Sequence, residues 1–199
     1  MNPSIDATMT AAEFVRTYAH VGGVELIDGK VVWAGRERNP PAEGIVMPAF
    51  RHGVVLNRVA HLLTQFIDEH RLGWTATGDA FVQTRTDPER VRGADFLFVS
   101  YARLPAGPTP ENLDVVPDLV VEIRSPSDRQ SAVLAKVSEY LAAGVRVVVV
   151  IDPRLEAAAT YRDDEFQQLV HNGDTFTLPD VLPGFAVPVS AFFARKERP

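Results

Sequence analysis

Apolar residues recur along the first half of the chain at a helical period and then at strand-like spacing. Residues 52–70 carry an apolar residue at every third or fourth position, which is the spacing of one helix face. We expect Gly73 to end this helix. Strands are then predicted over 74–83 and 94–100, separated by a charged loop over 84–93. The apolar positions of the helix face are Val55, Val59, Leu62 and Phe66.

The second half contains a strand, a helix and a further strand. Residues 117–125 are almost continuously apolar, which is typical of a strand covered on both faces. Ser127 and Gln130 have capping-box spacing and predict the start of a helix that runs to the residue before Gly144. A buried strand is predicted over 146–152. This order predicts two parallel strands joined by a right-handed crossover.

The N-terminal segment predicts a short helix and a hairpin. Thr10 and Glu13 have capping-box spacing, which opens a helix. Residues 24–35 then read as two apolar runs around the turn dipeptide Asp28-Gly29. We expect this hairpin to flank the central elements.

The whole pattern predicts an α/β fold with a mixed sheet and helices on its faces. Short alternating runs over 160–193 predict a small antiparallel extension. We expect one domain over 1–199, with an N-terminal helix and hairpin in 1–50, a core in 51–153 and a C-terminal β extension in 154–199.

Composition narrows the function. The chain has 199 residues and no cysteine, which excludes thiol catalysis, disulfides and thiolate zinc sites. The net charge of −6 argues against a protein coated with positive charge for bulk nucleic-acid binding, but not against a local basic groove. No apolar run is long enough to span a membrane, and the first residues do not resemble a signal peptide. We therefore expect a cytoplasmic protein without a membrane partner.

Glu122 is the most informative polar residue because it interrupts a strand that otherwise reads as buried. An ionised carboxylate there is costly unless a cation or a metal accompanies it. The alternative is a glutamate paired with a nearby arginine, or one at an exposed strand end.

Asp95 begins the preceding strand. If the two strands are neighbours in a suitable register, Asp95 and Glu122 approach each other, and their repulsion favours a cation between them. A hard divalent cation with oxygen ligands meets that need. Alternatively, Asp95 caps a turn at the start of its strand.

Lys136 lies in the helix between the last two strands. At about 100° per residue, Val133, Val137 and Tyr140 form its apolar arc, and Lys136 flanks that arc. Its ammonium could therefore reach the sheet near Glu122, or extend along the helix into solvent.

Together these residues predict phosphodiester hydrolysis. Asp95 and Glu122 would hold Mg²⁺ (or Mn²⁺), and Lys136 would orient the attacking water. We take His52, at the start of the first long helix, as a surface or capping residue, and no histidine has metal-ligand spacing.

The segment PDLVVEIRSPSDR, the following KVSEYLAAGV and the strand ending IDP resemble the Uma2 family, also called DUF820. ELIDGKVV, the histidine before the first long helix and LPGF match it as well. That family comprises predicted restriction endonucleases of the PD-(D/E)XK superfamily. The resemblance implies an α-β-β-β-α-β restriction-endonuclease-like core, Asp95 and Glu122 as metal ligands, and Lys136 as a migrated catalytic lysine.

Two positions depart from the superfamily pattern. Arg124 stands where a lysine usually follows the acid, and Ala94 replaces the proline before Asp95. An arginine is a poor group for activating water. A catalytically weak binding module on the same fold is therefore the competing hypothesis.

DNA is the expected partner, and a homodimer would supply two active sites for paired cuts. A basic rim could come from arginines in and before the core, namely Arg51, Arg58, Arg71, Arg85, Arg90 and Arg92.

Overall fold

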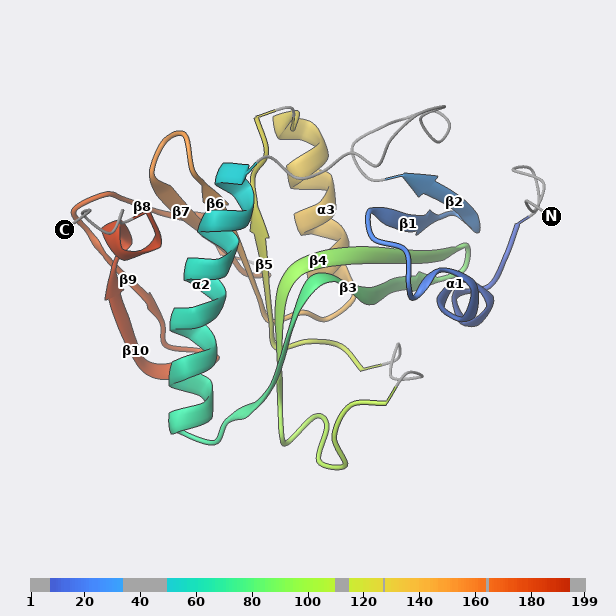
Figure 1. The fold of residues 1–199 in the computed structure, drawn as a ribbon, viewed down its shortest axis with the longest axis horizontal. Coiled ribbons are helices and arrows are strands. Elements are labelled where there is room, and N and C mark those ends of the chain that lie inside the picture. The colour runs from blue at the N-terminus through green and yellow to red at the C-terminus, as the bar shows by residue number, and fades with distance from the viewer. Residues whose placement is uncertain (1–7, 34–49, 110–114, 127, 164, 194–199) are drawn as a thin grey trace.

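The computed structural model describes residues 8–33, 50–109, 115–126, 128–163 and 165–193. Within these residues, three α-helices flank an eight-stranded mixed sheet and a separate two-stranded sheet (Figure 1). The helices are α1 (Ala11–Tyr18), α2 (Phe50–Glu69), α3 (Gln130–Ala142) and the short 3-10 helix η2 (Val189–Phe192). The large sheet contains β1 (Val24–Ile27), β2 (Lys30–Trp33), β3 (Gly73–Thr86), β4 (Glu89–Ser100), β5 (Leu119–Ile123), β6 (Val147–Asp152), β7 (Ala157–Tyr161) and β8 (Gln168–His171). The small sheet contains β9 (Thr175–Leu178) and β10 (Leu182–Pro188).

The central order α2-β3-β4-β5-α3-β6 confirms the predicted α-β-β-β-α-β core. The strand order in space is β2-β1-β4-β5-β6-β7-β8, with β3 paired to β4. Strands β5 and β6 are parallel and every other pair is antiparallel, as expected for a mixed sheet with one crossover helix.

The core has two main layers, one on each face of the sheet. On one face α2 packs with β9, β10 and η2 over Phe96, Phe98 and Val121. On the other face α3 packs over Leu97 and Val120, so adjacent residues of β4 and β5 alternate between the layers.

The N-terminal elements form as predicted. The side chain of Thr10 accepts a hydrogen bond from the backbone of Glu13, and the Glu13 side chain accepts one from the backbone of Thr10. Asp28 and Gly29 connect β1 to β2 with φ of 52° and 74°, the left-handed conformation of a two-residue hairpin turn. The predicted end of this hairpin and the 39–44 loop lie outside the described residues.

The prediction that Gly73 ends the long helix is wrong. Helix α2 stops at Glu69, and Gly73 is the first residue of β3. A β-carbon at Gly73 would lie 2.1 Å from the carbonyl oxygen of Val99 and 2.7 Å from the Cα of Ser100. Glycine is required here by the close approach of β4, and not by the helix end.

The predicted charged loop over 84–93 is also wrong. Strands β3 and β4 extend through most of it and pair from Gly73–Ser100 to Thr86–Glu89, so that only a tight turn remains at Asp87-Pro88. Val91 is fully buried beside α1 and β1, which stabilises the extended strand. Its charged neighbours have acidic partners on other elements, which no local pattern reveals.

The start of α3 differs from its prediction as well. The N-cap is Arg129, which makes no side-chain capping hydrogen bond, and the predicted capping residue Ser127 lies outside the described residues. The helix ends at Ala142 with Ala143 as its C-cap, one residue before the predicted Gly144. Gly144 follows with φ of 94°, the left-handed conformation of a glycine that terminates a helix.

The C-terminal segment contributes to both sheets. Strands β7 and β8 extend the edge of the large sheet beyond β6, while β9 and β10 form the separate hairpin beside α2 (Figure 1). In the described part of the chain, none of the helices is both long enough and apolar enough to cross a membrane.

Candidate active site

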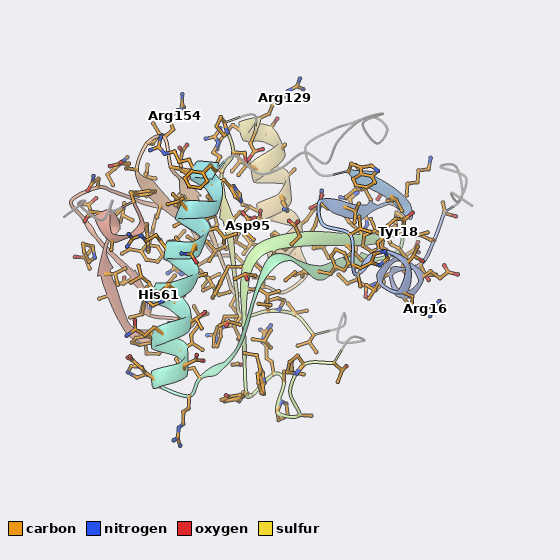
Figure 2. All side chains as sticks on the ribbon, viewed as in Figure 1. Arg16, Tyr18, His61, Asp95, Arg129 and Arg154 are labelled. Atoms are coloured by element: carbon orange, nitrogen blue, oxygen red, sulfur yellow. The ribbon has the colours of Figure 1, made fainter. Side chains whose placement is uncertain are left out.

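The candidate site lies where β4 changes partner within the sheet. Strand β4 pairs with β5 only over Phe96–Phe98, and further toward its start it pairs with β1 at Val91. Asp95 lies between these two contacts (Figure 2). The β4–β5 register pairs Phe96 with Val121, so its continuation would place Asp95 opposite Glu122, as the site prediction requires.

Glu122 is held by two side chains of α3. Its Oε2 accepts a hydrogen bond from Lys136 Nζ at 3.0 Å, and its Oε1 accepts one from the Tyr140 hydroxyl at 2.9 Å. Its side chain is 15% exposed. Burial raises the pKa of Glu122 to about 7, since Lys136 and Tyr140 only partly oppose burial and the negative charge of Asp95 adds to the rise.

Lys136 points into the protein, so the alternative of a solvent-directed lysine is wrong. Its Nζ donates to Glu122 and to the carbonyl of Gly93 at 2.8 Å, and it lies 3.3 Å from Oε1 of Glu25. Burial alone would lower the pKa of Lys136, but the two carboxylates outweigh it and raise the pKa above its ordinary value. The lysine therefore stays protonated at neutral pH.

Asp95 is fixed from both sides of its carboxylate. Its Oδ2 accepts a 2.6 Å hydrogen bond from the backbone N–H of Ile123, the residue after Glu122. Its Oδ1 lies 3.3 Å from Nε2 of His52. The first contact joins β4 to β5 at the point where their ladder ends.

His52 belongs to the site, so its interpretation as a surface or capping residue is wrong. Only 10% of its side chain is exposed, and its Nδ1 lies 3.4 Å from the Ser125 hydroxyl. The hydrogen bond to Asp95 raises the pKa of His52 despite the opposing effect of burial. No local signal separates this histidine from a capping residue, because its partner comes from a strand more than 40 residues later in the sequence.

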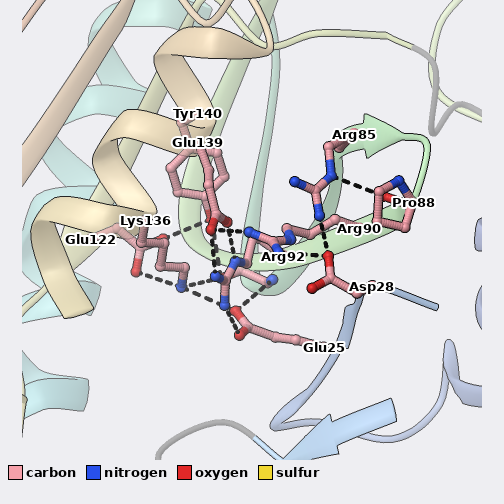
Figure 3. Close-up of polar contacts among 11 residues, drawn as sticks. Glu25, Asp28, Arg85, Pro88, Arg90, Arg92, Glu122, Lys136, Glu139 and Tyr140 are labelled. Atoms are coloured by element: carbon pink, nitrogen blue, oxygen red, sulfur yellow. Dashed lines mark hydrogen bonds and ion pairs between the residues drawn. The ribbon is translucent and has the colours of Figure 1, made fainter. Parts of the chain in front are cut away.

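Glu25 is a further acid that sequence reasoning did not find. Its carboxylate accepts hydrogen bonds from Arg92 Nη1 at 2.7 Å and from the backbone of Gly93 at 3.2 Å, besides its contact with Lys136 (Figure 3). Burial acts to raise the pKa of Glu25, but Lys136 and Arg92 lower it below its usual value. A glutamate within the apolar run VELI is the same signal that singled out Glu122.

The arginines of β3 and β4 do not form the suggested basic rim. Arg92 Nε donates to Glu139 at 2.6 Å, and Arg90 contacts both Glu139 and Asp28 (Figure 3). Arg85 pairs with Asp28 as well. Their charges are neutralised within the protein and link the hairpin β1–β2 to α3.

Arg124 points away from the predicted site. Its guanidinium donates to Asp152 Oδ2 at 3.2 Å and to the backbone carbonyl of Asp128 at 3.4 Å. It therefore supports the loop after β5, and Lys136 is the cation that reaches Glu122. Ala94, at the altered proline position, is fully buried.

The donor chemistry of the site fits a hard divalent cation. Asp95 and Glu122 supply carboxylate oxygens, and the raised pKa of Glu122 reflects burial together with the nearby charge of Asp95, which a cation would offset. Among the described residues, no group of three or more histidine, cysteine, aspartate or glutamate side chains is arranged to hold a metal. Such a cation would thus keep several water ligands, as Mg²⁺ commonly does.

Comparison with known proteins agrees with this architecture. Residues 43–190 match the model of the Uma2 family, described as "Putative restriction endonuclease". Among solved structures, the chain is similar to the crystal structure of a putative nuclease belonging to DUF820 from Anabaena variabilis. The two share 16% identity and a TM-score of 0.68 over 90% of this chain and 96% of the other. Curated proteins gave no match.

Proposed function

Because this chain belongs to the Uma2 family of nuclease-fold proteins, we propose that it is a metal-dependent endonuclease that hydrolyses DNA phosphodiester bonds. The observation that carries the proposal is that Asp95 accepts from the backbone of Ile123, next to Glu122, while Glu122 pairs with Lys136, all at the end of the β4–β5 ladder. Two acids and one ammonium at a single buried point are the groups that phosphodiester hydrolysis needs.

Asp95 and Glu122 would hold Mg²⁺ or Mn²⁺. Such a cation polarises a phosphate and lowers the pKa of a bound water. The backbone N–H of Ile123 fixes one oxygen of Asp95, and Tyr140 fixes one oxygen of Glu122. Each carboxylate keeps free lone pairs, so these contacts orient the acids without occupying them fully.

Lys136 would orient the attacking water and offset negative charge on the phosphate. Its protonated state suits both roles, since an ammonium donates hydrogen bonds but cannot accept a proton. His52, in contact with Asp95, holds that acid in place from α2.

One observation favours the competing function, a binding module with little turnover. The ammonium of Lys136 already donates two of its three N–H groups, to Gly93 and Glu122, and it is ion-paired with Glu25 at 3.3 Å. Unless one of these contacts is released, at most one N–H group remains for a water molecule or a phosphate.

A cleavage assay separates the two functions. Purified protein is incubated with duplex and single-stranded DNA in Mg²⁺, Mn²⁺ or EDTA. We expect cleavage that needs metal and that Glu122→Ala lowers by about 10³-fold, the effect of losing about 4 kcal/mol of transition-state stabilisation. Glu165→Ala is the control, because Glu165 is an exposed acid whose only partner among the described residues is Arg162.

Metal binding is measured on the same variants by calorimetry. Mn²⁺ binding that Asp95→Ala abolishes, in a protein with unchanged circular dichroism, supports the enzyme. Weak metal binding without cleavage of any DNA, in a protein that stays folded when Glu122 is replaced, supports the binding module. We also propose that a homodimer supplies two active sites for paired cuts. Light scattering tests this by measuring the molecular mass of the protein in solution.

A further inference from the structure

Three segments meet at one end of the molecule, beside the candidate site. They are the start of α2, the loop after β5 and the turn after β6. Arg51 of α2 donates to the carbonyl of Pro153 after β6, and His52 lies 3.4 Å from Ser125 in the loop after β5. These contacts hold the three segments together beside Asp95, which His52 also contacts.

Two acids of these segments, Asp152 and Asp128, face inward, as does Asp95 beside them. Asp152 is only 8% exposed and accepts from two backbone N–H groups and from Arg124. Asp128, which is half-buried, accepts from the backbone of Ser125. Asp95 is bound by Ile123 and His52. The negative charges are thus directed into the protein.

The arginines of the same segments face outward. Arg51, Arg129 and Arg154 are all exposed (Figure 2 labels the last two, at this end of the molecule). Among the described residues, the side chains of Arg129 and Arg154 make no ion pair or hydrogen bond, and the one polar partner of the Arg51 side chain is a neutral carbonyl. In the part of the chain that the structure describes, no acid therefore neutralises the charges of these three arginines.

We infer that Arg51, Arg129 and Arg154 form a surface that binds the phosphate backbone of DNA and guides it to Asp95. This inference rests on the proposed function, because the nuclease reaction is what makes DNA the ligand. Guanidinium groups match phosphate oxygens in geometry and charge. Three cations on one face can bind phosphates although the whole chain is acidic, because salt screens charges more than about 10 Å away.

The test is DNA binding in EDTA, where no hydrolysis occurs. Fluorescence anisotropy with a labelled duplex is recorded for the full chain at several salt concentrations. We expect Arg129→Gln with Arg154→Gln to weaken binding at least about tenfold. The plot of log binding constant against log salt concentration should also become less steep, by about 2 units of slope. Each arginine removed leaves one more phosphate with its counterion, so fewer counterions are released on binding.

A control with the same change of charge is available. Arg16, on α1, is also exposed, as is Arg71, which follows the opposite end of the 20-residue helix α2 from His52 and so cannot join a basic rim at the site. The double variant Arg16→Gln with Arg71→Gln therefore removes two charges away from this surface. Its affinity and salt slope should stay within about twofold of the parent protein. Equal losses in both double variants would overturn the inference, as would an unchanged affinity in the Arg129 and Arg154 variant.

The outcomes separate this inference from the proposed function. DNA binding that depends on Arg129 and Arg154, in a protein that never cleaves, keeps the surface and removes the hydrolytic function. Cleavage that does not change when the two arginines are replaced keeps the hydrolytic function and removes the surface. Binding of phosphatidylserine vesicles with no binding of DNA would also overturn the surface as a DNA site.

Discussion

Oε1 of Glu25 lies 3.3 Å from Nζ of Lys136, so an acid of the first strand reaches the ammonium of a helix near the end of the core. Lys136 is thereby held between two carboxylates, Glu25 and Glu122 (Figure 3). Glu25 can keep the ammonium in place when Glu122 turns toward another cation. The N-terminal hairpin is therefore a part of the candidate site.

Replacing Glu25 with glutamine should destabilise the protein. The change leaves Lys136 and Arg92 each with one carboxylate fewer, in a place where both cations are largely buried. We expect a loss of about 2–4 kcal/mol in the free energy of unfolding, measured by urea denaturation. Glu165→Gln, at an exposed ion pair, should cost less than about 0.5 kcal/mol. Equal losses at the two positions would contradict the assigned role of Glu25.

The pKa of Glu122 predicts how its variant responds to pH. The folded-state pKa of about 7 lies above the ordinary value of 4.5, so folding favours the protonated acid. The contribution of this group to stability is full below about pH 4.5 and declines as the pH rises through 7. Glu122→Gln lacks that decline. From pH 5 to pH 8 the free energy of unfolding of Glu122→Gln, measured in urea, should therefore rise by on the order of 2–3 kcal/mol relative to that of the parent protein. A constant difference across this range would show that the pKa is not raised.

Metal binding should depend on the same ionisation. A cation binds the deprotonated carboxylate, so Mn²⁺ affinity should fall up to tenfold for each pH unit below about 7 and level off above it. Calorimetry at pH 6 and pH 8, in two buffers of different ionisation enthalpy, measures both the affinity and the proton released. An affinity that does not change with pH would place the cation elsewhere.

His52 should hold its proton more firmly than an isolated histidine, because Asp95 accepts from its ring. Any stability that the protonated His52 contributes is therefore fully present below the pKa of this histidine in the unfolded chain. It is lost as the pH rises through the higher pKa of His52 in the folded protein. In NMR titrations of the ring protons, Asp95→Asn should lower the pKa of His52. If the substitution leaves that pKa unchanged, the contact does not form in solution.

Two glycines make a matched test of the fold. Gly73→Ala would place a methyl group against the backbone of Val99 and Ser100, so we expect a loss of more than about 3 kcal/mol or no folded protein. Gly53→Ala, in α2 with nothing within 4 Å of the added carbon, should instead stabilise the protein by about 0.5–1 kcal/mol. Thermal unfolding of both variants checks the pair.

Much of the core could be predicted from local pattern. The period of α2, the apolar run of β5 and the glycine after α3 each reflect a preference that acts within a few residues. Lys136 was predictable for the same reason, since its position beside the apolar arc follows from helix geometry alone. The sequence predicted that Asp95 and Glu122 approach each other only if their two strands are neighbours in a suitable register.

The remaining parts of the site depend on contacts between distant segments. The charged stretch 84–93 resembles a loop, and its arginines favour strand structure only because Glu25, Asp28 and Glu139 meet them from elsewhere. His52 likewise gains its role from β4. Local pattern carries no information about such partners, and so the histidine at Asp95 was missed. Glu25 carried the same local signal as Glu122, but its contact with Lys136 depends on a helix far along the chain.

The change of partner along β4 also constrains how the protein can be assembled during its synthesis. In the nascent chain β1 emerges well before the residues that it must meet, Val91 on β4 and Lys136 on α3. Until α3 has left the ribosome, Glu25 lacks the cation on that helix, and the hairpin β1–β2 lacks part of its support. The pairing of β1 with β4 must therefore form across a long intervening stretch of chain, and contacts between residues so far apart in sequence slow folding.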